Sequence, residues 1–311
     1  MNSRKIVITG ASGFLGSHLL ERLKDDERYT VVALSSRTEA LRQRVGGGNT
    51  EYLHKDAVLD GRAGSIMRGS IVVHCAYPRA SAGTAIADGL KYVRDVFESA
   101  VDNGAGAIIN ISSQSVYSPQ RAEAATERTP VSLESPYAVG KYATELMLES
   151  ACRHCDTAFT NIRMASLIGP GFDQRIVNRF VKQALETGKL SVKRNGQRFG
   201  FFDVEDAVGG LMAMLATDPR RWKRAYNLGG REAYTLEEIA ETVKSVLESR
   251  GDGPRIGIDY EEDDCGGCSG LDAGAFYGDF DFSPGVPLVR SVGKIAMYCA
   301  AGSQDRKREH G

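Results

Sequence analysis

Tyr137 and Lys141 are the residues whose types and spacing most directly suggest chemistry. They follow Ser135 and Pro136, which form a typical helix start with a serine cap and a proline in the first turn. Residues four positions apart share one face of a helix. A lysine ammonium beside a tyrosine favours the phenolate, so Tyr137 could exchange a proton with a carbinol or carbonyl oxygen. The lysine could also hold a ribose hydroxyl. The same spacing occurs in surface pairs, so it does not decide the function alone.

A second candidate lies in the polar run from Ser112 to Tyr117, which follows the apolar stretch Ala107–Ile111. In open α/β sheets, loops at the carboxyl ends of parallel strands form the ligand crevice. A hydroxyl in this run could therefore hydrogen-bond the same substrate oxygen that Tyr137 reaches. The alternative is an ordinary polar turn.

A glycine-rich turn near the N-terminus indicates phosphate binding. The β-branched run Lys5–Thr9 leads into Gly10, Gly13 and Gly16, and a helical pattern follows from Ser17. Such a turn directs backbone N–H groups and the positive end of a helix dipole at a pyrophosphate. The glycines allow a tight turn, a close approach of phosphate and close packing of helix on strand.

Apolar runs alternate with helical stretches through the first half of the chain. Continuous apolar strands separated by helices are typical of a parallel sheet covered on both faces. We therefore expect an α/β fold. The expected strands are 5–9, 30–34, 71–75, 107–111 and 159–164, with a helix at about 85–100.

After about residue 167 the pattern becomes more irregular, as in a region that covers a substrate. The glycine- and acid-rich segment 260–285 is expected to be a loop, and the polar residues 302–311 are expected to fray. The other expected elements are helices at 175–187, 205–216 and 235–249 and short strands at 190–192 and 225–228.

Composition limits the classes of partner. The 311 residues include 39 Lys and Arg against 40 Asp and Glu, a net charge of −1, so no nucleic acid partner is expected. No apolar run approaches the roughly 20 residues of a membrane span. No charged-then-apolar leader precedes the first strand. We expect a cytoplasmic protein that acts on a small molecule and does not bind membranes.

Six cysteines include two pairs with metal-like spacing, Cys152/Cys155 and Cys265/Cys268. Zinc sites built from such pairs usually have them close in sequence, whereas these two are far apart. We therefore expect no metal site. Of the two pairs, Cys265/Cys268 is expected to be the more exposed, because it lies in the acidic, glycine-rich segment.

Together these motifs resemble the extended short-chain dehydrogenase/reductase family, in its NAD-dependent epimerase/dehydratase branch. The resemblance covers nearly the whole chain to about residue 250. It implies a Rossmann-type, doubly wound parallel sheet over residues 1–167, a smaller α/β substrate-binding region over 168–300 and a polar tail, 301–311. The residues that carry it are 9–16, 112–117, 137–141, 163–171, 202–207 and 226–230.

The resemblance also implies roles for individual residues. Ser113 would be the catalytic hydroxyl, Tyr137 the acid/base and Lys141 its partner. A homodimer through the helices at 85–100 and 137–151 is implied as well. The cofactor-binding residues would be Gly10, Ser12, Gly13, Phe14, Leu15, Gly16, Ser35, Ser36, Arg37, Asp56, Ala57, Cys75, Ala76, Tyr77, Ser112, Tyr137 and Lys141. The substrate-binding residues would be Tyr77, Gln114, Ser115, Ser166, Arg175 and Arg198.

One departure from the family pattern bears on the choice of cofactor. The second strand ends in Ser35, Ser36 and Arg37, where an acid would hold a free ribose 2′-hydroxyl. Serine hydroxyls and an arginine would instead attract a 2′-phosphate, which favours NADP while NAD remains possible. Arg37 could also stack on adenine or face solvent.

Two further departures concern the reaction. Gln114 and Ser115 stand where the family's sugar-nucleotide dehydratases carry an acidic pair, so elimination of water is disfavoured. Ser166 replaces an asparagine that contacts the nucleotide diphosphate in many epimerases of the family. Arg175 and Arg198 are candidates for holding a diphosphate, although each could be an exposed charge.

Three functions follow. The first is an NAD(P)-dependent oxidoreductase of a nucleotide sugar or similar carbinol/carbonyl substrate, either an epimerase or a keto-sugar reductase. The second is an NADP-dependent reductase of a non-sugar ketone or aldehyde, which the serine at position 166 supports. The third is a nucleotide-sensing protein without activity, which the intact Ser113, Tyr137 and Lys141 oppose.

Overall fold

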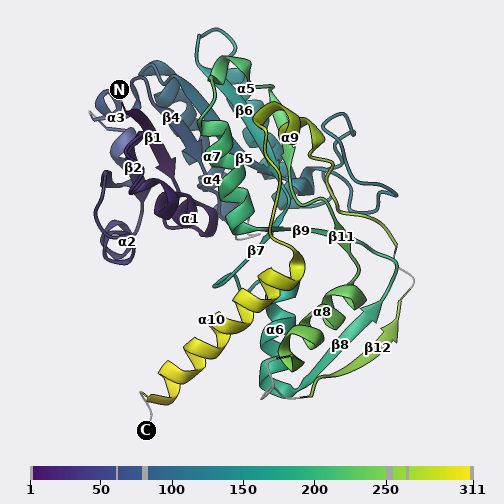
Figure 1. Cartoon of the computed structure of the whole chain (residues 1–311). Helices are drawn as coiled ribbons and strands as arrows, with labels where there is room; N and C mark the ends of the chain where they lie inside the picture. The colour runs from purple at the N-terminus through teal and green to yellow at the C-terminus, as the bar shows by residue number, and fades with distance from the viewer. Residues whose placement is uncertain (1–2, 61, 79–82, 250–254, 264–265, 309–311) are drawn as a thin grey trace.

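The structure is a computed structural model that describes residues 3–60, 62–78, 83–249, 255–263 and 266–308. Its centre is a seven-stranded sheet in the order β10-β6-β5-β4-β1-β2-β3, with every neighbouring pair parallel (Figure 1). The α/β class and the doubly wound parallel sheet are therefore confirmed. The strands are β1 (Arg4–Thr9), β2 (Tyr29–Ser35), β3 (Thr50–His54), β4 (Ile71–His74), β5 (Ala107–Ser113), β6 (Ala158–Met164) and β10 (Ala225–Leu228).

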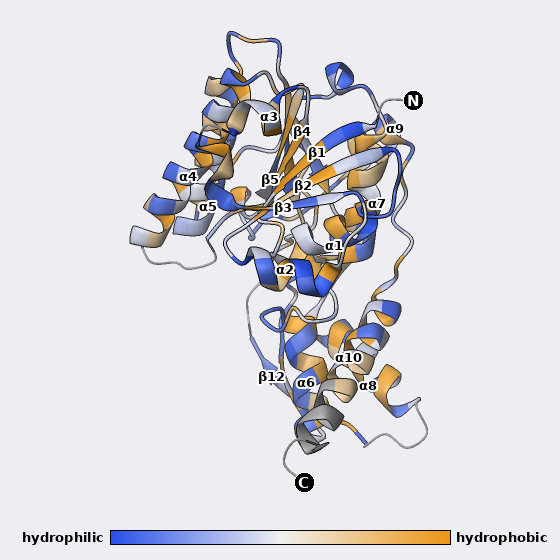
Figure 2. Ribbon diagram, turned by 90° about the vertical axis from the view of Figure 1, so that its left-hand side faces the viewer, coloured by the Kyte–Doolittle hydropathy of each residue, from blue (hydrophilic) through white to orange (hydrophobic). Residues whose placement is uncertain are grey.

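Helices cover both faces of this sheet, which is why its strands are apolar on both sides. The central strands are correspondingly coloured largely hydrophobic in Figure 2. One face packs against α1 (Phe14–Leu23), α2 (Thr38–Val45), α7 (Val204–Leu215) and α9 (Gly274–Phe280). The other packs against α3 (Ala63–Met67), α4 (Gly83–Asp102) and α5 (Pro136–Ala151).

A smaller second region has its own apolar core, below the sheet in Figure 1. It holds a three-stranded sheet, β11-β9-β7, and a two-stranded parallel sheet, β12-β8. Three elements from the second half of the chain, α7, β10 and α9, belong to the main sheet or pack against it. The remaining bounds are β7 (Ser166–Ile168), α6 (Ile176–Thr187), β8 (Lys189–Arg194), β9 (Phe199–Asp203), β11 (Ala233–Tyr234), α8 (Leu236–Glu248), β12 (Gly257–Glu262) and α10 (Leu288–Arg308); short 3-10 turns are η1 (Lys55–Val58), η2 (Gln114–Val116) and η3 (Pro219–Arg221).

The expectation that segment 260–285 is a loop is wrong. The segment 260–285 contains the end of β12 and the whole of α9, in which Phe276 and Phe280 are buried against Tyr226. The dense glycines and acids concealed this short aromatic helix. Helix α10 extends through the tail as far as Arg308; fraying of residues 302–311 stays a prediction. Strand β3 was not expected at all.

The expectation that Cys265/Cys268 is the more exposed cysteine pair is also wrong for the cysteines that the structure describes. Cys268 is buried, whereas Cys155 is exposed; Cys265 lies outside the described residues. No group of three or more potential metal ligands occurs among the residues that the structure describes. Within the same residues, none of the helices combines the length and apolar character needed to cross a membrane.

Candidate active site

One large open cleft, with a volume of about 1810 Å³, runs along the carboxyl ends of the main-sheet strands. Its walls come from the segments that follow β1, β2, β4 and β5, from α5, and from the chain around β7. Most residues singled out in the sequence lie on these walls. They are Gly10, Ser12, Gly13, Phe14, Leu15, Gly16, Ser35, Ser36, Arg37, Cys75, Ala76, Tyr77, Ser112, Ser113, Gln114, Ser115, Tyr137, Lys141, Ser166 and Arg175.

The glycine turn between β1 and α1 has the geometry of a phosphate cradle. Gly10 has φ +66°, and a Cβ on it would lie 2.7 Å from the backbone nitrogen of Ala76. A Cβ on Gly16 would lie 2.4 Å from the carbonyl oxygen of Gly10. Helix α1 begins after Gly13 without a side-chain cap and has no acidic residue in its first turn. Its amino end can therefore accept an anion, and the site fits the pyrophosphate of a dinucleotide.

The end of β2 forms one extremity of the cleft. The hydroxyl of Ser35 accepts the backbone N–H of Arg37 at 2.9 Å, which fixes the turn into α2. Ser36 and Arg37 are exposed there, and Arg44 of α2 lines the same extremity. Arg44 was not singled out in the sequence, because helix α2 alone brings it back toward the turn.

Two expected cofactor-binding residues do not line the cleft. The carboxylate of Asp56 binds the ammonium of Lys55 at 2.6 Å and lies 3.3 Å from the ring of His54. Ala57 is buried in the core beside α4. Lys55 lines the cleft instead. Asp56 and Ala57 belong to the turn η1 that follows β3. Because β3 was not among the expected strands, the sequence did not indicate which way these side chains point.

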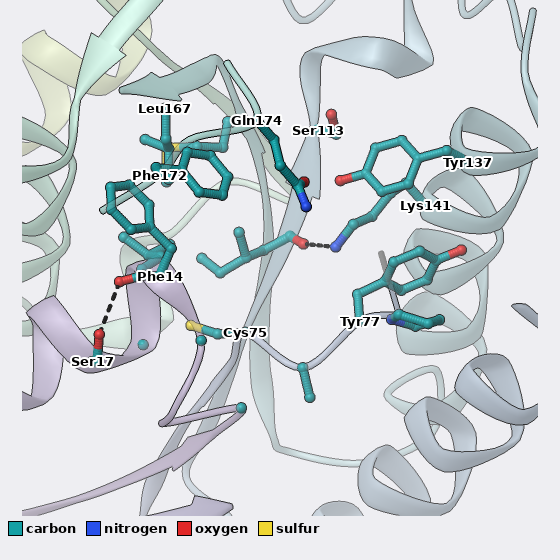
Figure 3. A pocket seen from close by; sticks show the side chains of 18 of the residues that line it. Phe14, Ser17, Cys75, Tyr77, Ser113, Tyr137, Lys141, Leu167, Phe172 and Gln174 are labelled. Carbon is teal, nitrogen blue, oxygen red and sulfur yellow. Dashed lines mark hydrogen bonds between the residues drawn. The ribbon is translucent and has the colours of Figure 1, made fainter. Parts of the chain in front are cut away.

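Ser113, Tyr137 and Lys141 come together on one wall, although β5 supplies the first and α5 the other two (Figure 3). The hydroxyl of Ser113 accepts a hydrogen bond from the hydroxyl of Ser115 at 2.9 Å and one from its backbone N–H at 3.2 Å. Ser135 caps α5, as expected, by accepting the N–H of Ala138 at 3.1 Å. The cap sets the start of the helix on which Tyr137 and Lys141 share a face.

The ammonium of Lys141 is buried. It donates to the carbonyl oxygen of Ile111 at 2.8 Å and lies 4.3 Å from the ring centroid of Tyr77. Burial lowers its pKa to about 8, while Cys75 and Glu145 act in the opposite direction. An ammonium in this position is charged at neutral pH and becomes neutral only under mildly alkaline conditions.

His74 and Cys75 at the end of β4 are held in neutral forms. Burial lowers the pKa of His74 to about 3, and its Nδ1 lies 2.8 Å from the hydroxyl of Thr9. Burial raises the pKa of Cys75 to about 12. Burial therefore opposes acid, base or thiolate chemistry at both residues near neutral pH. Cys75 lines the cleft, whereas His74 lies behind it, packed edge-on against Phe97.

The expected substrate residues are only partly gathered. The Gln114 amide donates to the Ser166 hydroxyl at 3.2 Å and accepts the Ser166 N–H at 3.3 Å. Arg175 lies over the ring of Phe172 at 5.3 Å. Phe172 in turn stacks on Phe14 at 4.2 Å, which joins the second region to the amino end of α1.

Arg198 lies outside this cleft. Its guanidinium donates to the Ala233 carbonyl oxygen at 2.6 Å and to the Glu238 carboxylate at 3.2 Å, in a separate, smaller pocket of the second region. Arg121 was not expected at the site, but it lines the cleft and donates to the Gly270 carbonyl oxygen at 2.7 Å. Nothing in the local pattern around Arg121 distinguishes it, because its position depends on contact with a segment far along the chain.

A buried ion pair lies behind the catalytic wall. The guanidinium of Arg163 in β6 binds the carboxylate of Glu145 in α5 at 2.8 Å, and both side chains are at least 90% buried. The same carboxylate accepts the hydroxyl of Ser112, and Arg163 donates to the hydroxyl of Tyr117 at 2.8 Å. Tyr117 donates to Asn227 in β10 at 2.9 Å. This network ties the helix of Tyr137 and Lys141 to three strands.

Comparisons with known proteins agree with this architecture. The model of the NAD dependent epimerase/dehydratase family matches residues 6–229. UDP-glucuronic acid decarboxylase 6 of Arabidopsis thaliana is 25% identical over 273 residues, which cover 79% of this chain and 75% of that protein. An uncharacterized UDP-glucose epimerase of Bacillus subtilis is 24% identical over 261 residues, covering 78% and 82%.

Solved structures show the same fold. The UDP-N-acetylglucosamine 4-epimerase of Bacillus cereus superposes with a TM-score of 0.79 at 21% identity, over 96% of this chain and 100% of that one. A UDP-glucuronic acid 4-epimerase of Bacillus cereus, in a variant complexed with a substrate analogue and NAD, gives the same TM-score and identity, over 96% and 99%. With the family match spanning most of the chain, from the glycine turn to the end of β10, the chain belongs to the NAD dependent epimerase/dehydratase family.

Proposed function

We propose that this protein is an NAD(P)-dependent oxidoreductase that acts on a carbinol or carbonyl carbon of a nucleotide sugar, as an epimerase or a keto-sugar reductase. One observation carries the proposal. Ser113, Tyr137 and Lys141 line the same cleft as the glycine cradle of α1. An acid/base group and a dinucleotide site thus share one cavity.

The residues have distinct tasks in this proposal. Tyr137 moves the hydroxyl proton of the substrate, and Ser113 orients the same oxygen, with its own hydroxyl fixed by Ser115. Lys141 favours the phenolate of Tyr137 and grips a ribose hydroxyl. A nicotinamide bound along the cleft would supply reversible hydride transfer at the carbon that bears this oxygen.

NADP is the cofactor that we propose, with NAD as the alternative. Arg37 is exposed at the end of β2, where Ser36 and Arg44 also line the cleft. Two guanidinium groups and a hydroxyl favour a 2′-phosphate over a free 2′-hydroxyl. Solved relatives are complexed with NAD, so titration with both cofactors decides the preference.

The second candidate is an NADP-dependent reductase of a non-sugar ketone or aldehyde. The mutual hydrogen bonds of Gln114 and Ser166 favour it, because they occupy polar groups that would otherwise be available to a nucleotide diphosphate. Elimination of water stays disfavoured, since Gln114 and Ser115 supply no acidic pair on this wall.

Three measurements test these proposals. Mass spectrometry of the nucleotide that co-purifies identifies the cofactor. A thermal-shift panel of UDP-, GDP-, CDP- and dTDP-sugars identifies the substrate class; a shift with one of them is expected, and no shift with any would contradict the sugar assignment. Titration with NAD⁺ and NADP⁺ tests the cleft itself, and absence of binding to both would overturn the whole proposal.

We also propose a homodimer formed through α4 and α5, in a cytoplasmic protein. These helices pack side by side on one face of the main sheet. The exposed Val139 and Leu146 leave an apolar strip on the outer side of α5, each with half of its surface accessible. Light scattering at twice the monomer mass is the expected result, and a monomer at micromolar concentration would refute it.

A further inference from the structure

Tyr77 contacts both catalytic candidates of α5. Its ring centroid lies 4.3 Å from the ammonium of Lys141 and 5.6 Å from the ring centroid of Tyr137, with the two rings perpendicular at 84° (Figure 3). The ammonium therefore has two contacts of different kinds, the carbonyl oxygen of Ile111 and the face of an aromatic ring. An aromatic face attracts a cation most strongly where water is excluded.

The position of Tyr77 depends on the absence of a side chain at residue 140. A Cβ on Gly140 would lie 1.8 Å from the hydroxyl oxygen of Tyr77 and 3.1 Å from its Cζ. Even alanine could not stand there with the ring in place. Glycine in the middle of a helix is otherwise unfavourable, so its presence one residue before Lys141 has a structural reason. Gly140 and Tyr77 form an interlocking pair.

The hydroxyl of Tyr77 does not explain this arrangement. Its oxygen is buried, points toward α5 and finds no hydrogen-bond partner among the described residues (Figure 3). No described residue therefore holds this side chain in place by a hydrogen bond to its hydroxyl. The described interactions of the Tyr77 side chain are the packing of its ring against Gly140 and the contacts of the ring with Lys141 and Tyr137.

We propose that Tyr77 is a positioning residue, which holds the Lys141 ammonium against the carbonyl of Ile111, and that Gly140 is the residue that admits it. The ring acts as a wall that prevents the lysine from turning away and that favours its charged form. Lys141 is thereby kept available for the cofactor ribose and for Tyr137. This inference rests on the proposed function for the role of Lys141, but not for the contact itself.

Other ionisable groups face the same ammonium and are unchanged in the variants below. Cys75 and His74 approach from the end of β4, while Glu145 and Tyr137 belong to α5 itself. Cys75 and His74 are neutral near pH 7 because they are buried. The Glu145 carboxylate is engaged by Arg163 and Ser112. A change in the pH behaviour of Lys141 on substitution of Tyr77 is therefore not due to Cys75, His74 or Glu145.

The contact is tested first on the protein without ligand. Gly140→Ala is expected to lower the midpoint of urea unfolding, because the Cβ displaces the Tyr77 ring. Adding Tyr77→Leu removes both the hydroxyl oxygen and the Cζ at 3.1 Å, and is expected to restore the midpoint to that of Tyr77→Leu alone. Gly293→Ala in α10, where a Cβ meets nothing within 4 Å, is the control and is expected not to lower it. Failure of the second substitution to rescue the first would refute the interlocking pair.

The positioning role is tested by cofactor binding as a function of pH. With NAD⁺ and NADP⁺ as probes, Tyr77→Leu is expected to weaken the tighter-binding cofactor about tenfold at pH 7, whereas Tyr77→Phe stays within about threefold of the unsubstituted protein. The pH at which binding declines as Lys141 loses its proton is expected to fall by about half a unit in Tyr77→Leu only. A merely structural ring would leave this midpoint unchanged.

The two kinds of failure can be told apart. Equal pH midpoints in Tyr77→Leu and Tyr77→Phe would overturn the positioning role while leaving the cofactor site intact. Absence of binding by the unsubstituted protein would overturn the proposed function, and the positioning role with it. The unfolding experiment would still report on the contact of Tyr77 with Gly140.

Discussion

Replacing Arg163 by methionine tests the polar network behind the catalytic wall. Methionine keeps much of the length of the side chain but removes every donor. The Glu145 carboxylate would lose the guanidinium contacts at 2.8, 3.1 and 3.2 Å and keep only the Ser112 hydroxyl. The Tyr117 hydroxyl would lose its donor as well. Both partners of the pair are more than 90% buried, so water does not replace the lost contacts without rearrangement of α5.

The magnitude follows from this burial. Breaking a buried ion pair from one side destabilises a protein by about 3–5 kcal/mol, because an uncompensated charge remains. Replacing both charges by neutral groups of similar size is far less harmful. We therefore expect Arg163→Met to destabilise by about 4 kcal/mol and Glu145→Gln/Arg163→Met by less than half of that. The expected coupling between the two sites is therefore more than about 2 kcal/mol, because the double variant loses less than half of what Arg163→Met loses alone.

Urea unfolding at pH 7, with the slope of the transition checked for constancy, measures these differences. Arg94→Met is the control. Arg94 pairs with Asp95 on the surface of α4 at 2.8 Å and is half exposed, so its loss is expected to change stability by less than about 0.5 kcal/mol. If Arg163→Met lowered the free energy of unfolding by less than about 1 kcal/mol, or if the two substitutions had strictly additive effects, the network would not be what holds α5 on the sheet.

Four further predictions concern the cleft. Tyr137→Phe should reduce turnover of a confirmed substrate at least about a hundredfold and leave cofactor affinity within about threefold; steady-state kinetics with unchanged turnover would exclude Tyr137 as the acid/base. Gly16→Val should abolish cofactor binding in a calorimetric titration, because its Cβ would lie 2.4 Å from the Gly10 carbonyl oxygen; undiminished binding would contradict the close approach of α1. Arg37→Asp should change the ratio of NADP⁺ to NAD⁺ affinity by about tenfold or more in favour of NAD⁺, and a constant ratio would exclude its contact with a 2′-phosphate. Burial lowers the pKa of His74 to about 3, so between about pH 6.5 and 3 only the unfolded state binds a proton at this residue. The His74 contribution to stability therefore falls by about 1.4 kcal/mol for each unit of acidification. When unfolding is measured between pH 6 and 4, the free energy of unfolding should depend less steeply on pH in His74→Gln, and equal slopes would refute a neutral histidine.

Local patterns determined much of this protein. The glycine turn, the β-branched runs and the capped helix at Ser135 are each set by neighbouring residues, through backbone conformation, burial period and hydrogen bonds within a few positions. The sheet, the candidate dinucleotide cradle and the convergence of Ser113, Tyr137 and Lys141 followed from these, because the carboxyl ends of parallel strands meet at one edge.

Tertiary structure decided what depends on distant contacts. Helix α9 forms because Phe276 and Phe280 find Tyr226 to pack against. Arg198 turns outward because Glu238 and Ala233 lie beside it. Neither contact has a local signal.

The pairing of Tyr77 with Gly140 shows the same limit inside the site. The two residues are 63 positions apart, and no sequence pattern links a tyrosine to a glycine at that separation. Their fit is recognised only in the folded chain, where a Cβ on Gly140 would lie 1.8 Å from the hydroxyl oxygen of Tyr77. Sequence determined which groups the cleft contains, since their types and local elements are encoded nearby. Which of those groups touch was settled by packing, since steric exclusion acts between surfaces that only the folded chain brings together.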